Sequence, residues 1–185
     1  MNPDAEFPEP AAGSRLLQPA GLHDLLLFRL ARLQAVAGAP VIRLCEGQYG
    51  ITRREWRLIV ALAQEGPMLS SALAERIRLD RGRTSLAVSA LVRKGLLTRQ
   101  PRPHDRRRVD LAPTAAAQAI YDALYPQVVA INRALLASLS PRELGQLDGL
   151  LQRLQAAADA ALAGAVLPKA NRREGGTRRH GVTGT

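Results

Sequence analysis

One stretch, residues 69–111, constrains the fold of this chain more than any other part of it. The stretch reads LSSALAERIRLD, then RGRTSLAVSALVRKG, then LLTRQPRPHDRRRVDL. Leu73 and Ile77 lie one helical turn apart in the first segment. The second segment repeats core-type residues at helical spacing: Thr84, Ala87, Val88 and Leu91. In the third, residues 96–99 and 107–111 alternate as short strands. We expect two short helices and a hairpin that packs on them, because a two-stranded hairpin is unstable alone.

Capping residues mark the ends of the two predicted helices. Ser70 and Asp80 precede them, and a side-chain oxygen at such a position accepts a backbone N–H that the first turn leaves free. Gly95 follows the second helix and ends it, since glycine adopts the left-handed conformation without strain. The outer face of this helix has no acid between residues 81 and 94 and consists of Arg81, Arg83, Ser85, Leu86, Ser89, Ala90 and Arg93. Such a face can approach phosphate groups without repulsion.

The outer face also has the chemistry that reads the major groove of duplex DNA. That groove is about 12 Å wide and accepts a helix that carries short polar side chains and flanking cations. Arg81 and Arg83 can donate to guanine O6 and N7 or to phosphates, and Leu86 can pack on a thymine methyl. The short side chains expected at the DNA are those of Ser70, Ser85 and Ser89. The alternative is a solvated helix face with ordinary arginines.

The basic hairpin that follows makes the solvated alternative the weaker one. Residues 99–110 hold five Arg and two Asp. Asp105 can pair with one arginine and shape the loop, which leaves Arg106 or Arg107 to enter the narrow, electronegative minor groove. An exposed ion pair of under about 1 kcal/mol is the other interpretation of Asp105, and the spacing does not choose which arginine inserts. Two adjacent phosphate-seeking elements together predict a winged helix-turn-helix for double-stranded DNA.

The net charge agrees with an anionic partner. Lys and Arg total 26 against 16 Asp and Glu, which gives +10 and an isoelectric point near 11.2. Nucleic acid is the first partner that this charge favours and a membrane surface the second. Membrane binding is disfavoured because the basic residues cluster on a helix and hairpin, not opposite an apolar face. A disordered, Pro-rich acidic arm is expected over residues 1–18, and a disordered basic tail over 168–185, either solvated or a nonspecific DNA tether.

Enzymatic and metal-binding functions find little support in the sequence. The chain has one cysteine, Cys45, so neither an internal disulfide nor a thiolate zinc site can form. We expect this thiol to be inert, with a redox role left open. The three histidines lie far apart, and no HExxH, GxSxG or phosphate-loop motif occurs. We expect no enzyme activity, metal or cofactor. The first residues do not resemble a signal peptide, and no apolar run can span a bilayer, so a cytoplasmic location is expected.

Helical patterns flank the predicted DNA-binding lobe, residues 52–113. An amphipathic helix is expected from Gly21 until Gly38 and Pro40 stop it, with one further turn over residues 41–45. Residues 52–55, TRRE, form a capping box that starts another helix, which ends at Gly66.

A long helix is expected from its cap at Thr114, with Pro126 kinking or breaking it. Residues 140–143, SPRE, form a second capping box. The helix behind it has apolar residues in the rhythm of a helix–helix seam: Leu144, Leu147, Leu151, Leu154, Ala158 and Ala161. The seam suggests a partner helix from a second copy of the chain.

Together these patterns, over residues 21 to about 163, resemble the MarR family of bacterial transcriptional regulators. The most specific parts are Leu73-Ala74-Glu75, Leu79-Asp80, Lys94-Gly95-Leu96 and Asp105-x-Arg107. Two positions depart from the family pattern. Leu86 stands where the family often has Arg, and Ala117 stands where a Gly is common.

The resemblance implies a mainly α fold with a small β-hairpin, in a domain over residues 19–167. It further implies a homodimer held by helices in residues 21–45 and 114–163, on a palindromic operator with one recognition helix in each half-site. Repression would be relieved by a small aromatic carboxylate bound between the dimerisation helices and the DNA-binding lobe. Candidate groups for that effector are Arg15, His23, Phe28 and Trp56, the first two for its carboxylate and the last two for its ring. A constitutive, nonspecific DNA-binding or architectural protein is the alternative.

Overall fold

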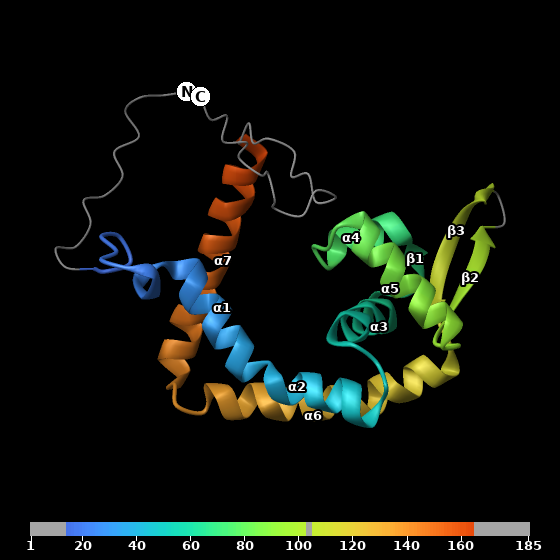
Figure 1. Cartoon of the computed structure of the whole chain (residues 1–185), viewed down its shortest axis with the longest axis horizontal. Coiled ribbons are helices and arrows are strands. Elements are labelled where there is room, and N and C mark those ends of the chain that lie inside the picture. Colours follow the sequence, from blue (N-terminus) through green and yellow to red (C-terminus); the bar gives the residue numbers. More distant parts are fainter. Residues whose placement is uncertain (1–13, 103–104, 165–185) are drawn as a thin grey trace, which may run out of the picture. The chain divides into compact units, whose positions relative to one another are not determined.

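The computed structural model describes residues 14–102 and 105–164, which form a mainly helical fold with one small sheet (Figure 1). The first elements are the short 3-10 helix η1 (Leu22–Asp24), α1 (Leu26–Ala37), α2 (Ala39–Arg43), the π-helical turn η2 (Leu44–Gln48) and α3 (Arg53–Glu65). They are followed by β1 (Met68–Leu69), α4 (Ser70–Arg76), α5 (Arg81–Arg93), β2 (Leu97–Arg102), β3 (Asp105–Pro113), α6 (Ala115–Leu136) and α7 (Pro141–Gly164). The chain divides into two compact units, Met1–Leu136 and Ala137–Thr185.

The core of the first unit is built around α3. Trp56, Leu58, Ile59 and Leu62 of this helix are all buried. Against them pack buried residues of α4, α5, the sheet and α6, namely Leu73, Ile77, Ala87, Val88, Leu91, Leu96, Leu97, Leu111, Ala117 and Leu124. The predicted core face of residues 84–91 is therefore confirmed. Ala117 is fully buried in this cluster, so the departure from Gly is accommodated on α6.

The sheet has three antiparallel strands in the order β1-β3-β2. Leu97 pairs with Pro113 and Arg99 with Leu111, and the ladder becomes irregular between Pro101 and Arg102. Both predicted strands exist and are longer than expected. The strand β1 is an addition to the predicted hairpin, since it pairs Met68 with Leu111. Two residues are too few to show alternation, which is why the sequence pattern did not reveal it.

The N-terminal helix differs from its prediction. Leu25 has extended backbone angles, φ −66° and ψ 125°, so α1 begins at Leu26 and not at Gly21. The expected first turn forms the separate η1, whose residues are not buried. A first turn without packing has little to hold it in a longer helix, because helices gain most of their stability from a buried face. The turn predicted over 41–45 is part of a longer helical segment that ends at Gln48.

Two further predictions about helices need correction. Ser70 is not the N-cap of α4, because Leu69 occupies that position and makes no side-chain capping bond. The helix α6 continues through Pro126 from Ala115 to Leu136, so of the two predicted outcomes the break is wrong and the kink stays a prediction. By contrast Thr114 does cap α6, since its Oγ1 accepts the N–H of Ala117 at 3.3 Å.

Candidate nucleic-acid interface

The N-terminus of α5 is held by the predicted cap. The Asp80 Oδ1 atom accepts the backbone N–H of Arg83 at 2.8 Å, and the Thr84 hydroxyl donates to the Asp80 carbonyl at 3.0 Å. The Arg83 Nε atom lies 3.3 Å from Asp80 Oδ2. Asp80 therefore both starts the helix and restricts the Arg83 guanidinium near its first turn.

The face of α5 away from the core is open to solvent as predicted. Its exposed residues are Arg81, Arg83, Ser85, Leu86, Ser89 and Arg93, while Ala90 is half-buried. Leu86 is 74% exposed. The face carries cations, short hydroxyl side chains and one large apolar side chain, with no carboxylate on the helix itself. Of the predicted DNA contacts, five lie together here, and Ser70 lies half-buried at the start of α4.

A left-handed glycine ends α5. Gly95 has φ +70°, and the Leu96 N–H donates to the Leu91 carbonyl at 2.9 Å while the Gly95 N–H donates to Val92 at 3.0 Å. These two bonds form a Schellman motif. The Thr114 hydroxyl donates to the Gly95 carbonyl at 2.9 Å, which joins this end of α5 to the start of α6.

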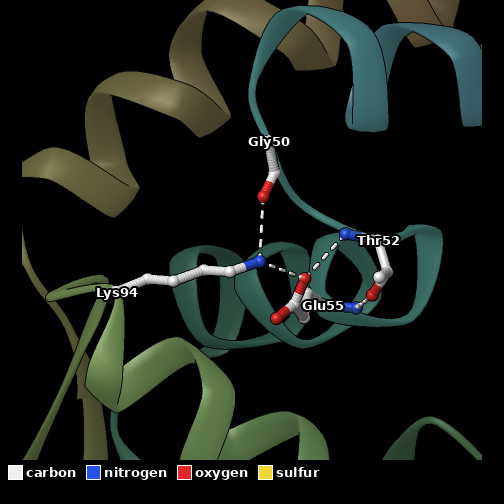
Figure 2. A network of polar contacts seen from close by, with 4 residues as sticks. All are labelled: Gly50, Thr52, Glu55 and Lys94. Carbon is white, nitrogen blue, oxygen red and sulfur yellow. Dashed lines mark hydrogen bonds and ion pairs between the residues drawn. The ribbon is translucent and has the colours of Figure 1, made fainter.

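A cluster of polar contacts holds the same end of α5 against the start of α3 (Figure 2). The Lys94 ammonium donates to the Gly50 carbonyl and to Glu55 Oε2, each at 2.8 Å. Glu55 Oε2 also accepts the Thr52 N–H at 2.6 Å, and the Glu55 N–H donates to Thr52 Oγ1 at 3.2 Å. We call these four residues, Gly50, Thr52, Glu55 and Lys94, the Lys94 junction.

The carboxylate of the Lys94 junction is buried, with Glu55 only 3% exposed. Burial alone would raise the pKa of Glu55, but the hydrogen bonds from Lys94 and Thr52 and the positive charge of Lys94 outweigh it, so the pKa lies below its ordinary value. Glu55 is thus ionised at neutral pH. The capping box was predicted from TRRE, whereas the contact with Lys94, 39 residues away, was not.

The turn between α4 and α5 is held from α3. Arg57 donates from its guanidinium to the carbonyl of Ile77, the residue that ends α4. The next residue, Arg78, has φ +50°, a left-handed conformation that is uncommon for a residue with a Cβ. The Leu79 N–H donates back to the Ala74 carbonyl at 3.0 Å. Arg57 was not predicted as a functional residue, and no local motif marks it.

The hairpin of β2 and β3 adjoins α5. Toward its tip, residues 102 and 105–108 are described by their backbone alone. Arg99, on its exposed part, pairs in register with Leu111, whose side chain is buried as predicted. The backbone of residues 105–108 belongs to β3. The side chains of Asp105, Arg106 and Arg107 lie outside the described residues, so their roles at the minor groove stay predictions.

A cavity of about 340 Å³ lies between α3, α4 and α6. Its wall is formed by Trp56, Arg57, Val60, Ala61, Gln64, Glu65, Arg76, Ile77, Tyr125 and Val128. Trp56 stacks with Tyr121 at 6.2 Å between ring centroids, and Tyr121 stacks with Tyr125 at 5.0 Å. The Arg76 Nε atom pairs with Glu65 at 2.6 Å. The cavity wall thus combines two rings, Trp56 and Tyr125, which both stack on Tyr121 outside the wall, with two guanidinium groups.

The four predicted effector residues do not form a single site. His23 and Phe28 meet edge to face with ring centroids 5.2 Å apart, and His23 lines an open hollow along α1. Trp56 instead lines the cavity beside α6, and Arg15 is exposed. The rings that accompany Trp56, Tyr121 and Tyr125, were not singled out from the sequence, although they are four residues apart on one helix face.

Comparison with known proteins identifies the family. The profile of the MarR family matches residues 49–108, from the Lys94 junction to the hairpin. A putative transcriptional regulatory protein for the hcr operon of Thauera aromatica is 32% identical over 127 residues, which cover 69% of this chain and 76% of the relative. The chain belongs to the MarR family.

Other relatives place this MarR-family chain among transcription regulators. The homoprotocatechuate degradative operon repressor of Escherichia coli is 25% identical over 134 residues, covering 71% of this chain and 88% of that protein. The crystal structure of NadR in complex with 4-hydroxyphenylacetate matches with a TM-score of 0.60 and 25% identity, over 70% of this chain and 92% of that one. The winged helix-turn-helix fold and the family resemblance are therefore confirmed.

Within residues 14–102 and 105–164, no three His, Cys, Asp or Glu side chains are grouped as metal ligands. Over the same residues, the helices are too short or too polar to cross a membrane. The family consists of transcription regulators, which are not enzymes.

Proposed function

We propose that this MarR-family regulator is a homodimeric repressor that binds a palindromic double-stranded operator through α5 and the hairpin, and that an aromatic carboxylate releases it. The observation that carries the proposal is the acid-free outer face of α5, held at one end by Asp80 and at the other by the Lys94 junction. A rigid helix that presents cations and short side chains fits the major groove. The hairpin supplies a second contact to the backbone or minor groove.

The dimer is supported by apolar surface outside the DNA-binding lobe. On α7 the exposed leucines are Leu150, Leu151, Leu154 and Leu162, between 44% and 68% exposed. On α1 the exposed apolar residues include Leu27, Leu30, Leu33 and Val36. Apolar rows of this kind on long helices are typical of surfaces that pack against another helix. Sedimentation of a chain ending at Ser138 tests α7. Loss of the dimer is expected, and a tight dimer would show that α7 is not the main interface.

Sequence-specific binding is tested against the alternative of a nonspecific architectural protein. Fluorescence anisotropy at physiological salt compares a fragment of the protein's own promoter with a scrambled fragment. We expect the promoter to bind at least about 1,000-fold more tightly. Equal affinities would refute the repressor proposal and favour the architectural protein.

Substitutions divide the interface into base-reading and phosphate-binding parts. Arg83→Ala should cost about 1–3 kcal/mol and relax the base preference, because a guanidinium near the first turn of α5 reaches base edges. Arg106 and Arg107 changed together to Ala should weaken binding to all DNA and flatten its salt dependence. The proposed docking would be contradicted if Arg83→Ala weakened binding to all DNA equally and the double change relaxed the base preference.

The effector proposal rests on the cavity between α3, α4 and α6. Trp56 and Tyr125 in its wall suit an aromatic ring, and Arg57 and Arg76 suit a carboxylate. The repressor of homoprotocatechuate degradation and NadR with 4-hydroxyphenylacetate support this ligand class. Arg57 also gives a route to DNA release, because a carboxylate that draws its guanidinium away from the Ile77 carbonyl loosens the turn before α5.

A thermal-shift and DNA-release experiment tests this ligand class. At about 100 times its Kd, 4-hydroxyphenylacetate should stabilise the protein by roughly 2.7 kcal/mol and lower its DNA affinity. Arg57→Gln should abolish the effect of the ligand, whereas Arg54→Gln, an exposed change on the same helix and outside the cavity wall, should preserve it. A ligand effect of equal size in both variants would exclude Arg57 from the response.

A further inference from the structure

A single row of side chains runs along the outer face of α5. Residues 83, 86, 90 and 93 are spaced by three, four and three, so they lie one above another on a helix. The row reads Arg83, Leu86, Ala90, Arg93, and only Ala90 is half-buried. Its two ends are cationic and its centre is apolar. We call Leu86 and Ala90 the methyl strip.

Leu86 does not follow the burial pattern of the other large apolar residues in the DNA-binding lobe. Within described residues 40–102 and 109–124 it is the only exposed large hydrophobic residue. The other exposed ones lie at residues 16–36 or on α6 and α7, where a second copy of the chain can cover them. Leu86 instead lies between Ser85 and Ser89, on the face proposed to meet DNA.

The partner that fits an apolar side chain among cations and hydroxyls is itself apolar at one point and anionic around it. The major groove offers such a group in the C5-methyl of thymine, flanked by base acceptors and by phosphates. From residue 83 to residue 93 the helix rises about 15 Å. That length covers about four base-pair steps of 3.4 Å, so the methyl strip lies between two guanidinium contacts.

We propose that the methyl strip reads the C5-methyl group of a thymine in each half-site, with Leu86 as the specificity-determining residue. This inference rests on the proposed binding of duplex DNA. It assigns a base preference to the position where the family often has an arginine. Removal of the contact lowers affinity for one base pair and leaves the fold intact, because the Leu86 side chain is 74% exposed.

The test begins with selection of bound duplexes from a random library by the full-length protein. Each thymine of the selected half-site is then replaced by uracil, which lacks only the methyl group. At one position per half-site we expect the wild type to lose affinity about fourfold, and about fifteenfold when both half-sites are changed. Leu86→Ala should bind the thymine and uracil duplexes equally at that position, and Leu86→Met should keep most of the difference.

Ser71→Ala is the control, since Ser71 is an exposed serine of α4 outside the predicted DNA contacts and should leave the thymine–uracil difference unchanged. A library that yields no preferred sequence overturns the proposed function and the methyl strip together. A preferred sequence that shows no uracil effect overturns the methyl strip alone. The same conclusion follows if the uracil effect persists undiminished in Leu86→Ala.

Discussion

The helices α3 and α7 begin with the same local motif in different surroundings. In α3 the Thr52 N–H donates to Glu55 Oε2 at 2.6 Å, and in α7 the Ser140 N–H donates to Glu143 Oε2 at 2.8 Å. Glu55 is 3% exposed, whereas Glu143 is exposed. Of the two glutamates, Glu55 is the one that also accepts a hydrogen bond from the Lys94 ammonium. A four-residue pattern thus specifies a helix start in both places and a tertiary junction in one.

The difference teaches where a capping box can contribute to function. At α7 the Glu143 carboxylate accepts the backbone N–H and the hydroxyl of Ser140, the cap of its own helix. At α3 the same carboxylate also holds the ammonium at the end of α5, and that ammonium reaches the Gly50 carbonyl before α3. The C-terminal end of α5 is therefore held by a cap that lies in another helix.

The largest expected effect comes from Glu55→Ala. The change removes the buried carboxylate that the Lys94 ammonium and the Thr52 N–H donate to, so the free energy of unfolding should fall by about 2–3 kcal/mol. Urea unfolding at one fixed protein concentration measures this. Glu143→Ala is the control and should cost well under half as much. Equal losses would show that burial of the cap does not matter.

Lys94→Met should have the next largest effect, about 1–2 kcal/mol, because Glu55 keeps its capping bonds and loses its counter-charge. Arg93→Met is the matched control one residue away, since Arg93 is exposed. It should change unfolding by less than about 0.5 kcal/mol while weakening DNA binding. If Arg93→Met destabilises the fold as much as Lys94→Met, the Lys94 junction has no special role.

Substitution of the two N-cap residues, Thr52 and Ser140, should change stability by less. Thr52→Ala should cost about 1 kcal/mol and Ser140→Ala about 0.5 kcal/mol, because Thr52 caps beside the buried Glu55 and Ser140 beside the exposed Glu143. Amide hydrogen exchange in the first turns of α3 and α7 resolves the two helices separately. If amide exchange became faster in α7 after Ser140→Ala but stayed unchanged in α3 after Thr52→Ala, the expected order of the two caps would be wrong.

The smallest expected effect is a difference between Glu55 and Glu143 in how the free energy of unfolding depends on pH. The pKa of both glutamates lies below the ordinary value, for Glu143 because Ser140 donates to its carboxylate. A lowered folded-state pKa contributes stability above the unfolded value of about 4.3, and that stability is lost as the pH falls through the folded value. Lys94→Met should raise the pKa of Glu55 and move this loss to higher pH. Unfolding measured between pH 3 and 6 checks the shift, and an unchanged acid limb would contradict it.

Local signals in the sequence predicted much of the fold. Asp80, Gly95 and the two capping boxes mark helix ends through bonds to neighbouring backbone, and the spacing of residues 84–91 marks a core face. The break at Leu25 was missed because leucine spacing continues across it while no packing enforces the helix there. Ser70 was misassigned as a cap because a serine oxygen is competent to cap without being required to do so.

The candidate site was predictable only where it depends on one helix. The outer face of α5 follows from its own periodicity, so its residues, apart from the half-buried Ala90, were named correctly as exposed. Lys94 with Glu55 and Arg57 with Ile77 join residues far apart in sequence, and no spacing rule encodes such pairs. Of the two rings in the cavity wall only Trp56 was predicted, for the same reason, since Trp56 and Tyr125 come from different helices.

The short strand β1 has a mechanical consequence. It pairs with β3 at Met68 and Leu69 and runs directly into α4 at Ser70. The base of the hairpin and the helix-turn-helix are thus linked by a peptide bond and by a strand ladder at the same point. In the proposed complex, a torque on the hairpin would therefore be transmitted directly to α4. Affinity should therefore depend on the bending stiffness of the operator as well as on its bases, because a flexible duplex lets both elements dock without straining this link.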